Sequence, residues 1–95
     1  MNCFFVYILK CNDGSYYTGH TDDLERRISE HKIGLYCKYT SKRRPIKLVF
    51  YQTFETRDSA FVVERKIKNW SRRKKEALIE KNWTKLSNFS KKKFK

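Results

Sequence analysis

Five polar residues that lie on or beside apolar faces could carry chemistry: Tyr7, Tyr17, Arg27, His31 and Glu64. The fork of an arginine can clamp a phosphate oxygen. A single carboxylate can hold one Mg²⁺ ion, which accepts few protein ligands and completes its shell with water and phosphate oxygens. A tyrosine beside an arginine and a metal can have its pKa lowered from about 10 and accept a proton from water. These residue types predict metal-assisted phosphodiester hydrolysis, with a plain nucleic-acid-binding module as the alternative.

Two strands must bring the tyrosines together. Residues 4–9 are aromatic, β-branched and apolar on both faces, which predicts a central strand covered on both sides. A polar turn that ends in Gly14 follows. A two-residue loop would send Tyr7 and Tyr17 to opposite sides of the sheet, whereas a three-residue loop places Gly19 opposite Tyr7 and both phenols on one face. We favour the three-residue loop because Gly14 suits the left-handed residue that closes it, and Gly19 then leaves open space beside Tyr7.

The next segment predicts a helix from about residue 23 to residue 33. Asp22 is the expected N-terminal cap, and Gly34 suits the residue that ends the helix. On a helical wheel of about 100° per residue, Arg27 and His31 emerge from the apolar, sheet-facing stripe one turn apart. The helix would therefore aim both side chains at the tyrosine face of the sheet.

A charged group on a sheet-facing stripe needs a partner. The alternative for Arg27 is therefore an ion pair with a carboxylate such as Glu64, or a side chain that only snorkels past the rim. Glu64 lies beside Ala60 at the edge of the apolar stripe of a later helix. Its own alternative is an ion pair with Lys68, one turn further on, worth only ~0.2–0.5 kcal/mol.

Residues 35–45 predict a basic loop closed by Pro45, in which tyrosines alternate with lysines and arginines. That mixture suits phosphate contacts and base stacking, and a solvated loop is the alternative. The following strand is predicted over residues 46–54, with Leu48 and Phe50 on the same face.

Two further helices are expected, the first capped by Thr56 or Asp58 and the second by Ser71. The second begins with basic residues, which oppose the helix dipole and are easier to understand if a polyanion docks there. The residues predicted to contact nucleic acid are Lys42, Arg43, Arg44, Lys68, Arg72, Arg73, Lys74 and Lys75.

The charge balance predicts the same kind of partner. The 95-residue chain carries a net charge of +13. Residues 1–64 hold 10 Lys and Arg against 8 Asp and Glu, whereas residues 65–95 hold 13 against 2. This asymmetry predicts a polyanionic partner, which is most often nucleic acid and less often an acidic membrane surface. We expect one folded domain over residues 1–83 and a basic, disordered tail over residues 84–95.

Other sites are not indicated. The cysteines, Cys3, Cys11 and Cys37, have no CxxC spacing, and neither histidine is placed to complete a zinc set. We expect reduced, buried thiols and a cytoplasmic protein. No signal-peptide pattern and no apolar run near 18 residues is present, so we expect neither secretion nor a membrane span.

The motifs also form a recognisable series: Tyr7-Ile8-Leu9, Tyr17-Thr18-Gly19 ten residues on, Asp23-Leu24-Glu25-Arg26-Arg27 with His31, the loop Tyr39-Thr40-Ser41-Lys42-Arg43-Arg44-Pro45, and Glu64 in a helix. Their order and spacing over about residues 3–80 closely resemble the GIY-YIG nuclease superfamily, in particular its short stand-alone bacterial members. Phe5-Val6-Tyr7 replaces Gly-Ile-Tyr, and Tyr17-Thr18-Gly19 replaces Tyr-Ile-Gly. Both tyrosines and the last glycine remain.

The resemblance implies an α+β fold, a small three-stranded antiparallel sheet flanked by helices in the order β-β-α-β-α-α. It implies that Tyr7 is a general base or water-positioning phenol, that Tyr17 holds the phosphate or the nucleophile, and that Arg27 stabilises the developing phosphorane charge. His31 would orient a tyrosine by a hydrogen bond. Glu64 would bind a single divalent cation, Mg²⁺ or Mn²⁺.

The function implied is that of an endonuclease, with DNA favoured over RNA as substrate and DNA repair or processing as its setting. A non-catalytic binding module that keeps the fold, or a small RNA-binding protein, is the alternative. Many family members attach this fold to a second domain that selects the target. We expect none here, so target choice would come from the basic helix and tail, from DNA shape, or from a partner protein or dimerisation.

Overall fold

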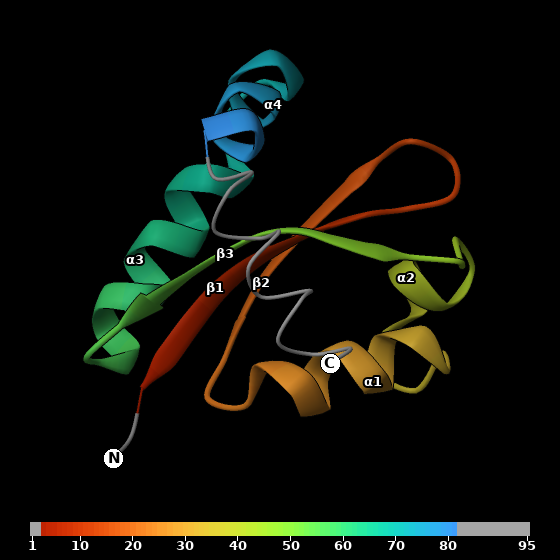
Figure 1. The fold of residues 1–95 in the computed structure, drawn as a ribbon, viewed down its shortest axis with the longest axis horizontal. Helices are drawn as coiled ribbons and strands as arrows, with labels where there is room; N and C mark the ends of the chain where they lie inside the picture. The colour runs from red at the N-terminus through yellow and green to blue at the C-terminus, as the bar shows by residue number, and fades with distance from the viewer. Residues whose placement is uncertain (1–2, 82–95) are drawn as a thin grey trace.

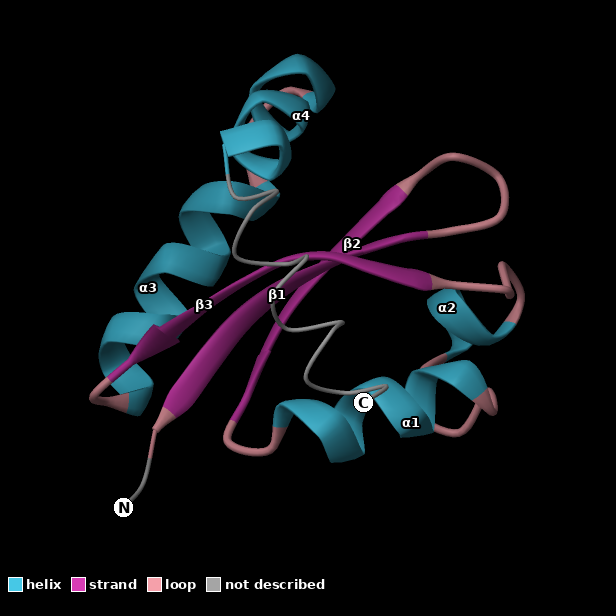
Figure 2. Ribbon diagram, viewed as in Figure 1, coloured by secondary structure: helices cyan, strands magenta, loops and turns pink. Residues whose placement is uncertain are grey.

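The computed structural model describes residues 3–81, which form an α+β fold (Figures 1 and 2). Its antiparallel sheet has the strand order β2-β1-β3, so that β1 is central and β2 is an edge strand. The elements are β1 (Phe4–Lys10), β2 (Tyr16–Thr21), α1 (Leu24–Lys32), α2 (Lys38–Ser41), β3 (Lys47–Phe54), α3 (Arg57–Lys68) and α4 (Arg72–Lys81). The predicted fold class is confirmed.

The two faces of β1 are both covered, as its apolar residues predict. Tyr7 and Leu9 pack with Leu24 and Ile28 of α1 on one face. On the other face, Val6 and Ile8 pack with Ala60 and Ile67, which form the apolar stripe of α3. Figure 1 shows α1 and α2 on one side of the sheet and α3 and α4 on the other. Residues that alternate along a strand therefore face different helices.

The β1–β2 hairpin has the three-residue loop that Gly14 predicts. The amide of Gly14 donates to the carbonyl of Cys11, the amide of Cys11 donates to Ser15, and Gly14 has φ +87°. Tyr7 consequently pairs with Gly19, and Leu9 pairs with Tyr17. Both phenols lie on the α1 face of the sheet.

The predicted faces of β3 are wrong from Phe50 onward. The register skips one residue between the pairs Ile8–Phe50 and Leu9–Leu48, which is a β-bulge. Leu48 faces α1, but Phe50 packs with the α3 side. A bulge reverses the alternation of every side chain beyond it, and the alternating apolar pattern of the sequence does not reveal one.

The helices begin close to the predicted residues. Asp23, not Asp22, caps α1, because its side chain accepts a hydrogen bond from the amide of Arg26. Thr56 caps α3, and the Ser71 hydroxyl accepts from the amide of Lys74 in α4. Residues 35–45, which were predicted to form a basic loop, contain the short helix α2, whose Thr40 side chain is buried against α1.

The cysteines are unpaired thiols, but only Cys11 is buried; Cys3 is exposed and Cys37 half-buried, so the expectation of buried thiols is wrong for these two. None of the helices described between residues 3 and 81 is long and apolar enough to span a bilayer. The predicted basic tail, residues 84–95, and the domain boundary at residue 83 lie outside the described residues.

Candidate active site

Tyr7 occupies the space that Gly19 leaves open. The phenol is fully buried, and a Cβ atom on Gly19 would lie 2.6 Å from the Tyr7 hydroxyl oxygen. Any other residue at position 19 would displace the ring. Since Gly19 belongs to the edge strand, the Tyr7 hydroxyl lies over the open margin of the sheet at β2.

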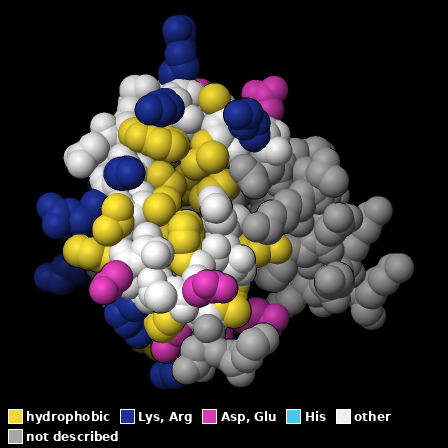
Figure 3. Space-filling model, turned by 90° about the vertical axis from the view of Figure 1, so that its left-hand side faces the viewer, with side chains coloured by type: hydrophobic (Ala, Val, Ile, Leu, Met, Phe, Trp, Pro, Cys, Tyr) yellow, Lys and Arg dark blue, Asp and Glu magenta, His cyan; other side chains and the backbone are white. Residues whose placement is uncertain are grey.

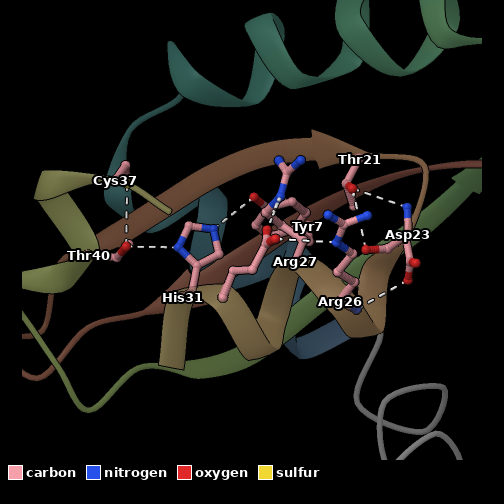
Figure 4. Close-up of polar contacts among 9 residues, drawn as sticks. Tyr7, Thr21, Asp23, Arg26, Arg27, His31, Cys37 and Thr40 are labelled. Carbon is pink, nitrogen blue, oxygen red and sulfur yellow. Dashed lines mark hydrogen bonds and ion pairs between the residues drawn. The ribbon is translucent and has the colours of Figure 1, made fainter. Parts of the chain in front are cut away.

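A chain of hydrogen bonds runs inward from this phenol (Figure 4). The Tyr7 hydroxyl lies 3.0 Å from His31 Nε2, and His31 Nδ1 lies 2.8 Å from the Thr40 hydroxyl. The Thr40 hydroxyl lies 3.4 Å from the Cys37 sulfur. Burial, and then the charge of Arg27, lower the pKa of His31 to about 4. At neutral pH His31 is therefore an uncharged imidazole bonded to the phenol.

Arg27 closes the outer side of the cluster. Its Nε donates to Glu30 at 3.2 Å, its guanidinium lies 3.9 Å from the centre of the Tyr36 ring, and it donates a hydrogen bond to Tyr7. Only 23% of the Arg27 side chain is exposed, against 76% for Arg26. The predicted inward orientation of Arg27 is confirmed, but its partner is Glu30 and not Glu64. The contacts with Glu30 and Tyr36 hold this guanidinium beside the Tyr7 hydroxyl, from where it could turn to an oxyanion.

Tyr17 completes the group on the α1 face. Its ring centre lies 6.4 Å from that of Tyr7, 5.2 Å from that of His31 and 6.0 Å from that of Tyr39. Its hydroxyl is hydrogen-bonded to the Cys37 side chain. The structure thus brings together Tyr7, Tyr17, Arg27 and His31.

The expected lowering of a tyrosine pKa joined an arginine with a metal, and Arg27 alone does not acidify the tyrosines of this cluster. Burial raises the pKa of Tyr7 well above its usual value, and the hydrogen bond and charge of Arg27 only partly oppose that effect. Burial, followed by the proximity of Tyr7, likewise raises the pKa of Tyr17. Both phenols are therefore protonated at neutral pH, and a proton can be taken up only if one is passed on.

Glu64 lies apart from these four residues. It projects from α3, which packs on the face opposite α1. Its Oε1 is hydrogen-bonded to His20 Nδ1, and its Oε2 lies 2.7 Å from Lys68 Nζ, which confirms the predicted ion pair. Burial alone would raise the pKa of the carboxyl, but the hydrogen bonds from Lys68 and His20 outweigh it and lower that pKa. Glu64 is an ionised, buried carboxylate.

The edge strand relates the two halves of the site. Gly19 adjoins Tyr7 on the α1 face, and the next residue, His20, contacts Glu64 on the α3 face. The predicted five-residue site is therefore divided between the two faces of the sheet, and the consecutive residues Gly19 and His20 of β2 each touch one half. The sequence could not place Glu64 this way, because the side on which α3 packs depends on tertiary contacts.

The chemistry of Glu64 suits one weakly held cation. Within residues 3–81 no group of three or more His, Cys, Asp or Glu side chains converges as a ready-made metal site. An ionised carboxylate still fits a Mg²⁺ or Mn²⁺ ion that keeps most of its water and takes phosphate oxygens. Because Lys68 and His20 engage both oxygens, such an ion would displace at least one of them.

Two of the basic residues predicted to bind nucleic acid also hold the hairpin loop in place. Arg43 donates to Asp13 at 3.0 Å. Arg72 donates to the Gly14 carbonyl at 2.7 Å and to Glu76 at 3.1 Å, which docks α4 on the hairpin. These contacts leave each side chain exposed by 34% and 56%, so they do not prevent contact with phosphate.

The remaining predicted basic residues differ in their surroundings. Lys74 lies 4.3 Å from the centre of the Trp70 ring, Arg44 donates to the carbonyl of Ser41, and burial lowers the pKa of Lys75. Figure 3 shows the side of the molecule that carries α3, where Lys and Arg side chains surround exposed hydrophobic ones. The predicted basic residues, Lys42, Arg43, Arg44, Lys68, Arg72, Arg73, Lys74 and Lys75, come from the α1–β3 segment, α3 and α4.

Sequence reasoning missed His20, Tyr36, Cys37 and Thr40. Strand alternation from Tyr17 places His20 on the opposite face, and this signal was available. The other three lie in or beside α2, whose contact with α1 is not encoded in any local pattern. No sequence signal marked them individually.

The family model described as the GIY-YIG catalytic domain matches residues 3–77. UPF0213 protein lwe0147 of Listeria welshimeri is 49% identical over 81 residues, which are 84% of this chain and 90% of that protein. UPF0213 protein SSP2268 of Staphylococcus saprophyticus is 47% identical over 83% of this chain and 96% of its own length.

Solved structures agree in fold. The solution NMR structure of the UPF0213 protein BH0048 from Bacillus halodurans has a TM-score of 0.54 and 46% identity, and it covers 82% of this chain and 83% of that one. The solution NMR structure of EF2693 from E. faecalis has a TM-score of 0.59 and 40% identity over 83% and 84%. This family match and these relatives show that the chain belongs to the GIY-YIG family.

Proposed function

We propose that this protein is a divalent-metal-dependent endonuclease that hydrolyses phosphodiester bonds, with DNA as the favoured substrate. The observation that carries the proposal is the buried Tyr7–His31 pair, in which an uncharged imidazole is hydrogen-bonded to a phenol beside Arg27. Membership of the GIY-YIG family supports nuclease chemistry in general. The strongly basic chain supports a nucleic-acid partner.

In this proposal the scissile phosphate crosses the free edge of β2 at Gly19 and His20. Arg27 turns from Tyr7 to a non-bridging oxygen of the phosphate, where its charge is worth most as negative charge develops. This movement also uncovers the Tyr7 hydroxyl, which is otherwise fully buried. Tyr17, half-buried beside Tyr7, holds the phosphate or the attacking water by its hydroxyl.

Tyr7 positions the attacking water and relays its proton. Burial raises the pKa of the phenol, so Tyr7 is protonated at neutral pH before the reaction. It can accept the proton of water if its own proton moves at the same time to Nε2 of uncharged His31. The base is therefore the Tyr7–His31 pair.

Glu64 holds the metal on the other side of β2. A bound Mg²⁺ or Mn²⁺ would supply Lewis-acid stabilisation of charge on the phosphate and the leaving oxygen. Glu64 is ionised and oriented by His20 for that task. Lys68, released from Oε2, becomes available to a neighbouring phosphate.

We further propose a cytoplasmic role in DNA repair or processing. Target choice would come from the basic residues of α4 and of the tail at 84–95, from the shape of the nucleic acid, or from a partner protein or second copy. These basic groups act through phosphates and carry no sequence information themselves.

A non-catalytic module that binds DNA or RNA is the second candidate. It is favoured by the full burial of Tyr7 and by the two side chains, His20 and Lys68, that already engage Glu64. A protein of this kind would bind nucleic acid with strong salt dependence and leave the phosphodiester bonds intact.

A nicking assay separates the two candidates. Supercoiled plasmid and branched DNA are incubated with wild type, Glu64→Ala and Tyr7→Phe, in Mg²⁺, in Mn²⁺ and with a chelator. Glu80→Ala, which removes an exposed carboxylate from α4, is the matched control. We expect metal-dependent nicking by wild type and the control, and a loss of about 100-fold or more in the other two variants. Equal activity in all variants would overturn the catalytic proposal, and salt-sensitive binding without cleavage would favour the module.

A further inference from the structure

We propose that Thr40 is a positioning residue that fixes His31 in its Nδ1–H tautomer, so that Nε2 is kept bare to receive the proton of Tyr7. The tautomer assignment stands on the hydrogen-bond network alone, while its catalytic consequence rests on the proposed nuclease function.

The network of Tyr7, His31 and Thr40 is buried away from water. Tyr7, His31 and Thr40 all have 0% of their surface exposed. In such surroundings a polar hydrogen without an acceptor is strongly destabilising, so the arrangement that satisfies every donor prevails. The two ring nitrogens of His31 each have one partner, the Tyr7 hydroxyl at 3.0 Å and the Thr40 hydroxyl at 2.8 Å.

One direction of donation satisfies the whole chain. The Tyr7 hydroxyl donates to Nε2 of His31, Nδ1–H donates to the Thr40 oxygen, and the Thr40 hydroxyl donates to the Cys37 sulfur. Cys37 can end the chain, because its sulfur can accept from the Thr40 hydroxyl. Arg27 donates to the Tyr7 oxygen in the same sense.

The reverse direction fails at its outer end. If Thr40 donated to Nδ1, Nε2–H would donate to the Tyr7 oxygen, which already accepts from Arg27. The Tyr7 hydroxyl hydrogen would then need another acceptor. Among residues 3–81 its side-chain partners are His31, whose Nε2 would already be protonated, and Arg27, which can only donate. Placing that hydrogen on Nε2 of His31 removes the cost.

The tautomer determines which way a proton can move. As the water oxygen bonds to phosphorus, its O–H bond breaks and the proton joins the Tyr7 oxygen. The original Tyr7 proton moves to Nε2, which gives an imidazolium that still donates to Thr40 through Nδ1–H. The bond from phosphorus to the leaving oxygen breaks, and that oxygen takes a proton from solvent. With Nε2 already protonated, this transfer would have no acceptor.

Nitrogen-15 NMR of the histidine rings tests the assignment directly. Protonated and bare ring nitrogens differ widely in shift, and long-range correlations identify which nitrogen carries the proton. In the wild-type protein at pH 7 we expect bare Nε2 and protonated Nδ1 for His31. Protonated Nε2 in wild type would overturn the proposal.

Two substitutions then test the part played by Thr40. Thr40→Val keeps the shape but removes the acceptor, so we expect the Nε2–H form to gain population at least tenfold. Thr40→Ser keeps the hydroxyl and should retain the wild-type tautomer. If Thr40→Val folds and leaves the tautomer unchanged, Thr40 does not fix it. If Thr40→Val does not fold, Thr40→Ala takes its place. A gain of the Nε2–H form in Thr40→Ala supports the role of Thr40, and an unchanged tautomer contradicts it.

Cleavage kinetics give the functional arm. We expect a fall of about tenfold or more in the single-turnover rate of Thr40→Val, with substrate binding unchanged and the rate restored in Thr40→Ser. An unchanged rate would overturn the catalytic consequence. If wild type shows the expected tautomer but never cleaves, the nuclease proposal fails while the assignment of the tautomer stands.

Discussion

His31 is held uncharged by its surroundings. Burial is the main cause of its lowered pKa of about 4, and the neighbouring charge of Arg27 adds to it. An unfolded chain would bind the proton at the ordinary pKa of about 6.5. The folded protein therefore keeps a proton acceptor beside Tyr7 at neutral pH, at the cost of stability in acid.

The first prediction concerns the loss of stability in acid. Between about pH 6.5 and pH 4 the unfolded state binds more protons than the folded state, so the free energy of unfolding falls as the pH falls. His31 contributes at most about 1.4 kcal/mol per pH unit to this slope. Urea unfolding of wild type and His31→Gln over this range measures the difference. Parallel curves for the two proteins would show that His31 is not the group responsible.

The residue-level chemistry was only partly open to sequence reasoning. Arg27 and His31 could be placed because a helical wheel needs only local periodicity. The direction of the pKa shift of Tyr7 could not be predicted, because it depends on the burial of the phenol beside Arg27 and Gly19. His20 was overlooked although strand alternation placed it.

At the scale of elements, the hairpin is fastened by side chains from distant parts of the chain. Arg43 follows α2, Arg72 begins α4, and both bond residues of the loop that ends at Gly14. The basic start of α4 is thus explained partly by structure, since Arg72 joins α4 to the sheet. Its neighbour Arg73 is exposed to solvent.

This difference gives a matched pair. Arg72→Ala should lower the free energy of unfolding by about 1 kcal/mol, because the hydrogen bonds to the Gly14 carbonyl and Glu76 are lost. Arg73→Ala should change stability by less than about 0.5 kcal/mol. Instead it should weaken nucleic-acid binding and reduce the salt slope by about 1. Chemical unfolding and fluorescence titration at several salt concentrations distinguish them, and identical stability losses would contradict the assignment.

Lys68 supplies a second element-scale prediction. It engages Oε2 of Glu64 from one turn further along α3, and so competes with a cation. Lys68→Ala should tighten Mn²⁺ binding in the absence of nucleic acid by roughly two- to fivefold, the value of an ion pair of ~0.4–1 kcal/mol. Lys66→Ala, an exposed lysine on the same helix, is the control for lost charge. Paramagnetic titration measures both; equal tightening would mean that only net charge matters.

The elements themselves were largely predictable, and the exceptions have physical causes. Loop chemistry at Gly14 determined the register that joins Tyr7 to Gly19. The bulge before Phe50 and the helix around Thr40 were missed, because both are fixed by contacts with other elements rather than by local sequence.

The whole molecule is a small basic body whose charge is concentrated late in the chain. Long-range attraction to phosphates is expected to be independent of sequence and screened by salt. If the phosphate crosses the edge of β2 as proposed, the basic surface would orient the backbone of the nucleic acid toward that edge.

Removing residues 84–95 tests the contribution of the tail, which carries Lys85, Lys91, Lys92, Lys93 and Lys95. We expect weaker binding to all sequences alike and a flatter dependence of affinity on salt. The measurement is binding of several unrelated oligonucleotides across a salt series. A salt slope equal to that of the full chain would show that these lysines do not contact the phosphates.

The most direct test of the account compares Arg27→Ala with Arg26→Ala. Both remove one positive charge from the same turn of α1, and both side chains contact Glu30. Only Arg27 lies against Tyr7 and faces the proposed phosphate. Single-turnover cleavage of a labelled DNA substrate in Mg²⁺ should fall by about 100-fold or more in Arg27→Ala and stay near the wild-type rate in Arg26→Ala. Equal rates in the two variants would contradict the assignment of this cluster as the active site.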